Sequence, residues 1–465
     1  MPVQPRTPPG VLELLPPQQL AFQRMLDTIR RGFERFGFLP VETPVFELTD
    51  VLLTKSGGET EKQVYFVQST GALKQAQAAP AGSDKPPELA LRFDLTVPLA
   101  RYVAEHEHQL NFPFRRYQIQ RVYRGERAQK GRYREFYQCD IDVIGKDTLA
   151  LAYDAEVPAV IDGIFAELGF GKFTIRVNNR KLLRGLLESL GIDEPRHAAV
   201  LHEVDRLGKQ ARPEIEARLA GDGVGLEPAV ATRLLDLLSA HAGDSRAALA
   251  ALREVANPTE ALTGGLAELQ RVYEGTLALG VPESRFQIDL SIARGLDYYT
   301  GTVYETFLDD HPRLGSICSG GRYENLAGHY TKSKLPGVGI SIGATRLFSQ
   351  LLEMKVIDET TVAISDVLVL QVEPTLAATY AELATELRRA GLNVEVYGGE
   401  DKLAKQFKYA DRAKVPLAVI CGSRERDAGI VKVKDLRSAT EHDVPRAGLV
   451  TRVRELLARP ATPAT

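Results

Sequence analysis

The chain of 465 residues is 44% hydrophobic, and its 58 lysines and arginines nearly balance its 61 aspartates and glutamates, for a net charge of −3. One hydrophobic core rarely grows beyond roughly 250 to 300 residues, so this length predicts a globular protein with two or three domains. The near-neutral charge excludes a general attraction to nucleic acids or membranes, so local basic patches would have to hold any polyanionic partner.

Cysteine content and hydropathy indicate the compartment. Cys139, Cys318 and Cys421 are scattered without CxxC spacing, which argues against a disulfide framework and against a structural zinc site. No segment approaches the roughly 20 apolar residues of a membrane span, and the N-terminal TPPGVLELLPP lacks the long apolar run of a signal peptide. We therefore expect a cytoplasmic protein that is neither exported nor anchored.

The N-terminal part predicts a long helix that leads into an edge strand. LAFQRMLDTIRRGFERFGF has apolar positions recurring at spacings of three and four, and LPVETPVFE is a β-rich run with Pro44 inside it. Residues 71–90 lose aromatic side chains and gain Ala, Gln, Gly and Pro, which predicts a mobile surface loop. In LRFDLTVPLAR (91–101), Arg92, Asp94 and Thr96 recur with period two, which predicts a strand with one polar face.

Two β-type segments then flank RAQKGR, whose Gly131 marks a turn, and predict a long antiparallel hairpin. Its first part, RVYRGERAQKGRYR (121–134), holds six basic residues and one acid. On the second strand one face is apolar, and the opposite face carries Arg134, Phe136, Gln138, Asp140 and Asp142. Because unpaired buried polar groups cost ~1–3 kcal/mol each, this polar face is either open to solvent, as antiparallel sheets often are, or part of a ligand pocket.

The remaining chain changes pattern three times. Residues 190–285 have Leu, Ala, Glu and Arg at helical spacing, which predicts a helical insertion, and residues 286–355 are strand-like and rich in glycine. GVGISIGATRL (337–347) predicts a strand that passes into a helix with Arg346 in the first turn. Helix N-termini favour phosphate, so Arg346 is either a phosphate ligand or a solvated helix charge.

After a short connector, the last hundred residues alternate between strand-like and helix-like segments. They predict a small separate α/β domain with a mostly parallel sheet. Its segment KLAKQFKYADRAK is rich in lysine, which is typical of a solvated helix face and also of a surface that binds single-stranded bases and phosphates.

Together these segments resemble histidyl-tRNA synthetases, the class II aminoacyl-tRNA synthetases specific for histidine. FGFLPVETPVFE resembles motif 1, the dimer-forming segment of the class. Residues 115–145 resemble motif 2, and GVGISIGATRL resembles motif 3 with its arginine. RGLDYYTGTVYE and SGGRYENL are similar to the two signatures peculiar to the histidine enzyme.

The resemblance implies an α+β fold in which helices flank the antiparallel sheet of a class II synthetase. The catalytic core would comprise residues 1–189 and 286–355, interrupted by a helical insertion at 190–285 that contacts the acceptor arm of tRNA. A connector at 356–365 would lead to a C-terminal α/β anticodon-binding domain at 366–460. The implied activity is that of a histidine--tRNA ligase, which makes histidyl-adenylate from L-histidine and ATP and transfers histidine to the 3' end of tRNA(His).

For ATP, the resemblance implies that Arg124 holds the α-phosphate, that Glu126 lies near the adenine edge, and that Phe136 stacks on the ring. Arg346 would hold the γ-phosphate, and Mg²⁺ would accompany the departing pyrophosphate. The histidine carboxylate is already ionised at neutral pH, so it can attack the α-phosphate without a protein base, provided that cations hold the two anions together. We expect Arg294 and Arg124 to be these catalytic cations.

For histidine, the resemblance implies three ligands of the α-amino group and a second set around the imidazole. The amino ligands would be Asp94, Thr96 and Gln138. The imidazole nitrogens would be read by Asp142 and Tyr299, with Tyr298 and Arg294 alongside.

The resemblance further implies a homodimer, and Arg127 and Gln129 would meet the acceptor end of tRNA. We expect no protein-bound metal. His106 and His108 in EHEHQ are two histidines on one predicted strand face without further ligands, which is more typical of a polar surface.

Two other functions share this architecture. A regulatory subunit of ATP phosphoribosyltransferase usually lacks the anticodon domain and loses ATP-binding residues, whereas Arg124, Arg294, Arg346 and residues 366–458 are all present here. A tRNA-sensing module of a stress kinase would need a kinase domain, and the sequence has no G-x-G-x-x-G strand turn followed by a lysine.

Overall fold

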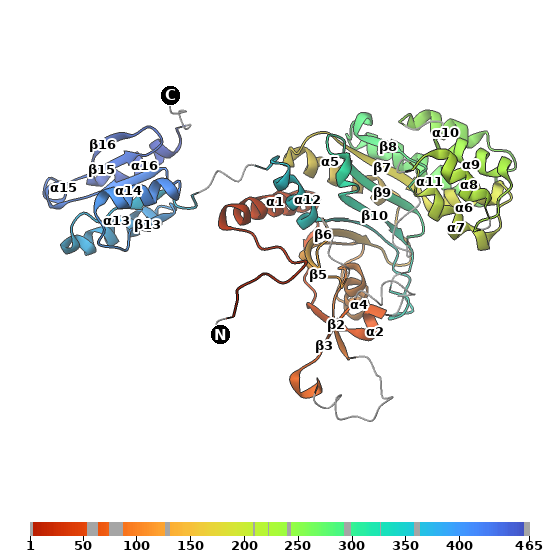
Figure 1. The fold of residues 1–465 in the computed structure, drawn as a ribbon, viewed down its shortest axis with the longest axis horizontal. Helices are drawn as coiled ribbons and strands as arrows, with labels where there is room; N and C mark the ends of the chain where they lie inside the picture. The colour runs from red at the N-terminus through yellow and green to blue at the C-terminus, as the bar shows by residue number, and fades with distance from the viewer. Residues whose placement is uncertain are drawn as a thin grey trace. The chain divides into compact units, whose positions relative to one another are not determined.

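The computed structural model of the chain divides into two compact units, one holding most residues up to Ile357 and the other those from Asp358 on (Figure 1). The described residues are 3–53, 64–73, 87–125, 131–207, 210–221, 223–239, 243–292, 299–325, 327–357 and 363–459. No helix within these ranges is long and apolar enough to cross a membrane.

The larger unit is built on an eight-stranded sheet whose strands come from well-separated parts of the chain. Neighbouring strands are antiparallel except for the first pair and the last pair. In spatial order they are β1 (Leu39–Pro40), β5 (Phe114–Tyr123), β6 (Glu135–Ile144), β11 (Gly337–Ile342), β10 (Cys318–Tyr323), β9 (Thr302–Leu308), β7 (Phe173–Asn179) and β8 (Phe286–Ile288). The run LPVETPVFE, predicted as one edge strand, is divided. Leu39 and Pro40 form β1 at the edge of this sheet, whereas Phe46 and Glu47 belong to a strand of another sheet, and Pro44 lies in neither.

Strands β5 and β6 form the predicted hairpin, and their register extends its polar face. Gln118 lies opposite Asp140, and Arg116 lies opposite Asp142. Residues directly opposite in an antiparallel pair project from the same side of the sheet, so the polar row of β6 continues across β5. Arg116, Gln118 and Asp140 are all buried. The polar face is therefore enclosed, which decides between the two alternatives that the alternation left open.

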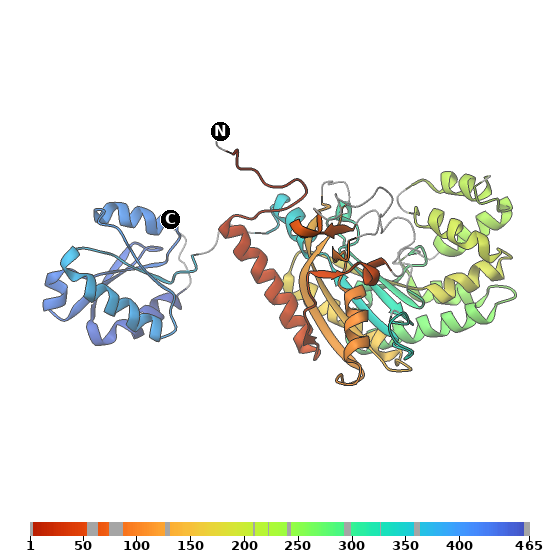
Figure 2. The ribbon, with the colours of Figure 1, turned by 90° about the horizontal axis from the view of Figure 1, so that it is seen from below.

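Helices cover the apolar face of the same sheet. They are α1 (Pro16–Arg35), α5 (Ala152–Leu168) and α12 (Ala344–Glu353). Phe22 of α1 packs against Phe348 of α12, with ring centroids 5.0 Å apart, and edge-on against Tyr137 of β6 at 5.6 Å. Figure 2 shows α1 alongside the strands of the sheet. The opposite, polar face is left for a cavity.

The strand predicted over 91–101 is wrong. Strand β4 (Leu89–Leu91) ends there, and helix α4 (Thr96–His106) begins five residues later. The Asp94 carboxylate accepts a hydrogen bond of 3.1 Å from the amide of Val97, and Pro98 lies in the first turn, where proline is tolerated. Because α4 runs to His106, the two histidines of EHEHQ do not share a strand face either.

A three-stranded antiparallel sheet follows motif 1 in the order β2 (Phe46–Leu48), β4, β3 (Tyr65–Val67), with α2 (Thr49–Leu53) after β2. Most of the loop predicted over 71–90, residues 74–86, lies outside the described residues. Its last two residues belong to β4 instead.

The helical region begins earlier than the pattern predicted, at α6 (Arg180–Ser189). Helices α7 (Glu194–Val204), α8 (Arg212–Ala220), α9 (Pro228–Ser239), α10 (Ser245–Arg253) and α11 (Glu260–Ala278) follow. Helices α6 and α11 cross closely at two glycines. A Cβ on Gly185 would lie 2.0 Å from the amide nitrogen of Leu262, and a Cβ on Gly265 would lie 2.3 Å from that of Leu182.

The C-terminal unit carries a five-stranded sheet in the order β13 (Val394–Val396), β12 (Val367–Val369), β14 (Leu417–Ile420), β15 (Ile430–Asp435), β16 (Thr440–Pro445). The predicted strand–helix alternation is correct up to β14, with α13 (Ala377–Arg389) and α14 (Leu403–Arg412) between the strands. The prediction of a mostly parallel sheet is wrong, because β14–β15 and β15–β16 are antiparallel. Helices α15 (Ser423–Asp427) and α16 (Leu449–Leu457) complete the unit.

Candidate active site

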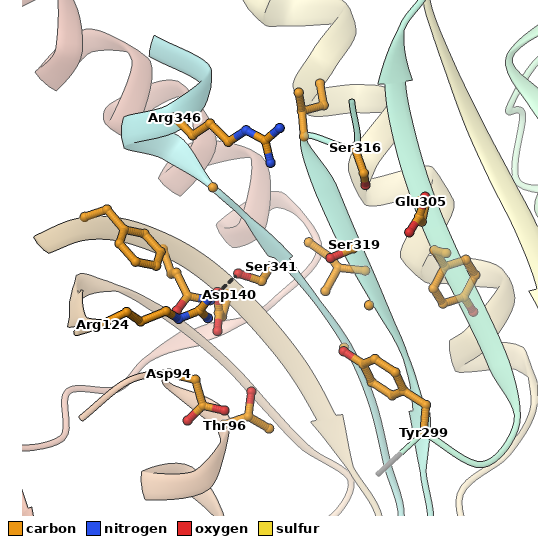
Figure 3. A pocket seen from close by; sticks show the side chains of 18 of the residues that line it. Asp94, Thr96, Arg124, Asp140, Tyr299, Glu305, Ser316, Ser319, Ser341 and Arg346 are labelled. Atoms are coloured by element: carbon orange, nitrogen blue, oxygen red, sulfur yellow. Dashed lines mark hydrogen bonds between the residues drawn. The ribbon is translucent and has the colours of Figure 1, made fainter. Parts of the chain in front are cut away.

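A cavity of about 570 Å³ opens on the polar face of the eight-stranded sheet (Figure 3). Strands β6, β11, β10 and β9 line it, together with the segment before α4 and the first turn of α12. The close packing of these strands depends on glycine at one point, because a Cβ on Gly339 would lie 2.3 Å from Oδ1 of Asp142.

One end of the cavity is cationic and aromatic. Arg124 donates through Nε to the carbonyl of Phe93 at 3.0 Å, and its guanidinium carbon lies 5.1 Å from the ring centroid of Phe136. Arg346 is half-buried, donates to the carbonyl of Leu314 at 2.5 Å and points into the cavity (Figure 3). Burial, followed by the charge of nearby Arg132, lowers the pKa of Arg346. These guanidinium groups favour an anionic ligand at this end.

The cavity wall next to Arg124 is rich in carboxyl and amide groups, and the Arg124 charge acts on Asp94 (Figure 3). Asp94 bonds Val97 through Oδ1, whereas its Oδ2 is buried and has no hydrogen-bond partner among the described residues. Gln138 donates to the hydroxyl of Ser341 at 2.7 Å, and its Oε1 likewise lacks a described partner. Asp142 is already engaged on both oxygens.

The contacts of Asp142 come from two buried neighbours. Nη2 of Arg116 lies 2.5 Å from Oδ2 in an ion pair, and the hydroxyl of Tyr323 donates to Oδ1 at 2.9 Å. Burial raises the pKa of Asp142, and the Arg116 charge opposes that rise. Burial likewise raises the pKa of Asp94 to about 6 and that of Asp140 to about 7. The site therefore gathers three buried carboxyl groups, of which only Asp142 is held in an ion pair among the described residues, with Arg116. Carboxyl groups in this position can accept hydrogen bonds from a cationic ligand group.

The structure brings most of the predicted residues to this one cavity. Those that line it are Asp94, Thr96, Arg124, Phe136, Gln138, Asp142, Tyr299 and Arg346. Glu126, Arg127, Gln129, Arg294 and Tyr298 lie outside the described residues.

Several side chains to which the sequence analysis assigned no role also line or support the cavity. They are Arg116, Asp140, Glu305, Ser319, Tyr323 and Ser341. The signal for Arg116 was present, because RRYQIQ alternates polar and apolar residues just as the partner strand does. Asp140 stood on the predicted polar face but was given no ligand. Ser319 and Ser341 are short polar residues within glycine-rich strands and carry no comparable pattern.

The buried cysteines have no chemical role in this arrangement. Cys139 and Cys318 are free and buried, and burial raises the pKa of both thiols. A thiol of this kind is a poor nucleophile, so both act as packing residues.

Comparison with known proteins identifies the family. Residues 10–347 match the family model described as histidyl-tRNA synthetase, and residues 366–456 match the model described as an anticodon binding domain. The histidine--tRNA ligases of Xanthomonas campestris pv. campestris and Stenotrophomonas maltophilia are both 58% identical to the chain. The matches span 456 and 453 residues, which is 97% of this chain and 96% and 97% of theirs. The crystal structure of histidyl-tRNA synthetase from Nostoc sp. PCC 7120 has a TM-score of 0.87 at 39% identity, with 98% of this chain and 100% of that chain covered.

The chain belongs to the histidyl-tRNA synthetase family. Family membership makes it an aminoacyl-tRNA synthetase, a ligase that uses ATP to attach histidine to tRNA(His). The predicted α+β class II fold with a C-terminal anticodon-binding domain is confirmed. Because histidine--tRNA ligases match almost the whole chain, the synthetase is favoured over the regulatory subunit and the kinase-linked sensor.

Proposed function

We propose that the cavity on the eight-stranded sheet is where this synthetase forms histidyl-adenylate. The proposal rests on one observation: arginines and carboxyl groups line the same cavity of about 570 Å³. ATP needs cations for its phosphates, and histidine needs acceptors for its amino and imidazole nitrogens. Both substrates must meet in one space for the carboxylate of histidine to reach the α-phosphate.

ATP binds at the arginine-rich end. Phe136 stacks on the adenine ring, Arg124 holds the α-phosphate, Glu126 lies near the adenine edge, and Arg346 holds the γ-phosphate. The half-buried position of Arg346 beside a second arginine supports its role, since the two cations repel each other until an anion arrives.

Histidine binds at the carboxyl-rich end. Asp94, Thr96 and Gln138 bind the α-amino group, and buried acceptor atoms on Asp94 and Gln138 support this role. Asp142 and Tyr299 read the imidazole nitrogens, with Tyr298 and Arg294 alongside. The ion pair with Arg116 keeps Asp142 oriented and opposes the rise in its pKa that burial causes, which favours the ionised form as an acceptor for a ring N–H.

The chemistry requires cations instead of a general base. The carboxylate of histidine attacks the α-phosphate, and pyrophosphate leaves. Arg124 and Arg294 screen the repulsion between the two anions and stabilise the charge that develops on the phosphate. The carboxyl oxygen needs no deprotonation, so no buried carboxyl group has to accept a proton in this step.

Mg²⁺ supplies additional positive charge on the phosphates when it is bound with ATP. It prefers oxygen ligands and usually keeps several waters, binding through one or two carboxylates and the substrate phosphates. Glu305 and Ser319 offer such oxygens in the cavity wall. Among the described residues, no group of three His, Cys, Asp or Glu side chains is placed to hold a metal ion.

Transfer of histidine to tRNA(His) involves further parts of the chain. Arg127 and Gln129 meet the acceptor end. The helical insertion at 190–285 contacts the acceptor arm, and the domain at 366–460, reached through the connector at 356–365, binds the anticodon. The catalytic core then comprises residues 1–189 and 286–355. The model matches at 10–347 and 366–456 support this division.

The enzyme acts as a homodimer in the cytoplasm. The outer face of the sheet β2–β4–β3 supports dimerisation, because alternation places Phe46, Leu48 and Leu89 on one side, and these side chains are 52%, 45% and 38% exposed. Contiguous exposed apolar residues of this kind mark protein interfaces. Three free, buried cysteines suit a reducing compartment.

Pyrophosphate exchange tests the proposal directly. The purified enzyme should incorporate labelled pyrophosphate into ATP when L-histidine and Mg²⁺ are present. It should not do so with other amino acids, because a site built to hydrogen-bond its substrate rejects analogues that lack those groups. Exchange that is independent of histidine, or absent in a folded and dimeric preparation, would refute the proposal.

A further inference from the structure

Three buried acceptor atoms on residues that line the same cavity have no hydrogen-bond partner among the described residues. They are Oδ2 of Asp94, Oε1 of Gln138 and Oδ1 of Asp140, on side chains of residues that are 4%, 8% and 2% exposed. A buried acceptor without a donor costs ~1–3 kcal/mol. Three such atoms in one cavity indicate donors that arrive with the ligand.

We propose that Asp140 is a further substrate-binding residue, whose carboxylate joins Asp94, Gln138 and the hydroxyl of Thr96 around the α-ammonium group of histidine. This inference rests on the proposed function, because it assumes that histidine occupies this end of the cavity. It adds to the site a residue that the resemblance did not implicate.

The strand register brings the acceptor of Asp140 towards that of Gln138. Asp140 lies directly opposite Ser341 in the β6–β11 pair, and the amide of Gln138 donates to that same serine at 2.7 Å. The Gln138 side chain therefore leans along β6 towards the level of Asp140. Figure 3 shows Asp140 and Ser341 together in the cavity, with Asp94 on the same side.

The number and geometry of the donors distinguish an ammonium group from the imidazole ring. An ammonium group has three N–H donors around one nitrogen, so it can satisfy three converging acceptors at once. An imidazole has at most two N–H groups, which lie in the ring plane and diverge. Asp142, the next residue on the same face of β6, is already held by Arg116 and Tyr323 and suits the ring.

The charge balance points the same way. The charge of Arg116 acts on Asp94, Asp140 and Asp142, but its guanidinium is ion-paired with Asp142. Arg124 also acts on Asp94, and the buried Arg92 interacts with Asp140. Burial raises the pKa of Asp140, because the ionised carboxylate is less stable here than in water before the ligand arrives. A cationic ammonium group stabilises the ionised carboxylate when it binds.

Binding of three histidine-like ligands to Asp140→Asn tests the inference. L-Histidine and L-histidinol both carry the ammonium group and the ring, whereas imidazolepropionate keeps the ring and the carboxylate but lacks the ammonium group. We expect Asp140→Asn to weaken calorimetric binding of histidine and histidinol by about 10- to 100-fold, the usual range for a hydrogen bond to a charged group. Binding of imidazolepropionate should stay within about twofold of wild type.

Two further variants complete the design. Asp140→Ala should give the same ammonium-specific loss, so the result does not depend on how asparagine packs. Asp147→Asn is the matched control, because Asp147 is exposed and has a φ of 64°, a conformation that asparagine tolerates, and it should leave all three affinities unchanged.

An equal loss for all three ligands would overturn the inference, since it would place Asp140 on the ring or in a purely structural role. No loss for histidine in the Asp140 variants would overturn it as well. Failure of the proposed function is a separate result. In that case the wild-type enzyme would not bind histidine or support histidine-dependent exchange at all.

Discussion

Asp94 and Asp140 are carboxyl groups that ionise less readily in the folded protein than in water. Burial is the main cause of both raised pKa values. The amide of Val97 and the charges of Arg124 and Arg116 oppose the rise at Asp94. Arg116 and the hydroxyl of Ser341 oppose it at Asp140. A carboxyl group with a raised pKa binds protons more tightly in the folded state. Between pH 4 and 7 the folded protein therefore holds more protons than the unfolded chain, so stability of the ligand-free enzyme falls as pH rises through that window.

Asp140→Asn, which cannot ionise, should remove part of this fall. With a pKa of about 7 in the folded state, the stability advantage of the variant over wild type should grow by about 2 kcal/mol between pH 5 and pH 8, then level off. Thermal unfolding of both proteins without ligand, measured across this range, checks the prediction. A difference that stays constant with pH would show that Asp140 is not protonated in the free enzyme.

At this scale the sequence predicted much of the site and missed its charge balance. Alternation along β6 correctly placed Gln138, Asp140 and Asp142 on one face. The prediction treated that strand alone, however, and it is the register with β5 that pairs Arg116 with Asp142. Register depends on the turn and on packing across the sheet, and these are tertiary properties that one strand does not contain.

At the scale of elements, short polar patterns were less reliable than long apolar ones. The hairpin β5–β6 and the helices α1 and α13 were predictable because their apolar periodicity spans ten or more residues. LRFDLTVPLAR offered only three polar residues at period two. The side-chain bond from Asp94 to the backbone of Val97 instead starts helix α4, and local capping of this kind overrides a weak strand pattern.

The contact between β11 and β6 yields a second prediction. Gly339→Ala would place a Cβ 2.3 Å from Oδ1 of Asp142 and from the carbonyl of Ile141, so it should displace Asp142 and weaken histidine binding by at least about tenfold. Calorimetric titration with histidine measures this. Gly163→Ala in α5 is the matched control, because its Cβ meets no atom within 4 Å and alanine favours a helix. Equal affinities of the two variants would contradict the proposed position of Asp142 at the ring.

At the scale of the whole molecule, the proposed reaction site and the anticodon-binding domain lie in separate units. All described residues of the cavity precede Ile357, and the C-terminal unit has its own hydrophobic core. That core includes Leu383, Leu417 and Val433. Because the unit is independent, strand–helix alternation alone was enough to predict its extent. Its antiparallel strands β15 and β16 were not predicted, because they follow the last segment to which the pattern assigned a structure.

A chain that ends after Ile357 should therefore still form histidyl-adenylate but charge tRNA(His) poorly. Loss of contacts to the anticodon should also reduce the salt dependence of tRNA binding, because each phosphate contact contributes roughly 0.7 to 0.9 to the slope of log affinity against log salt. Pyrophosphate exchange, aminoacylation and filter binding across a salt series provide the measurements, with sedimentation to show that the shortened chain is dimeric. Full charging efficiency by this shortened enzyme would exclude the anticodon role of residues 366–460.

The central claim is that one cavity joins ATP and histidine through cations, with no protein base. Pyrophosphate exchange by Arg124→Ala at saturating histidine tests it most directly, because Arg124 is proposed to hold the α-phosphate and lies beside Asp94, one of the proposed histidine ligands. Loss of one group that stabilises a developing charge costs about 100- to 1,000-fold in rate. We expect histidine-dependent exchange at saturating histidine to fall by that factor. Near-normal exchange in the folded variant would contradict the account.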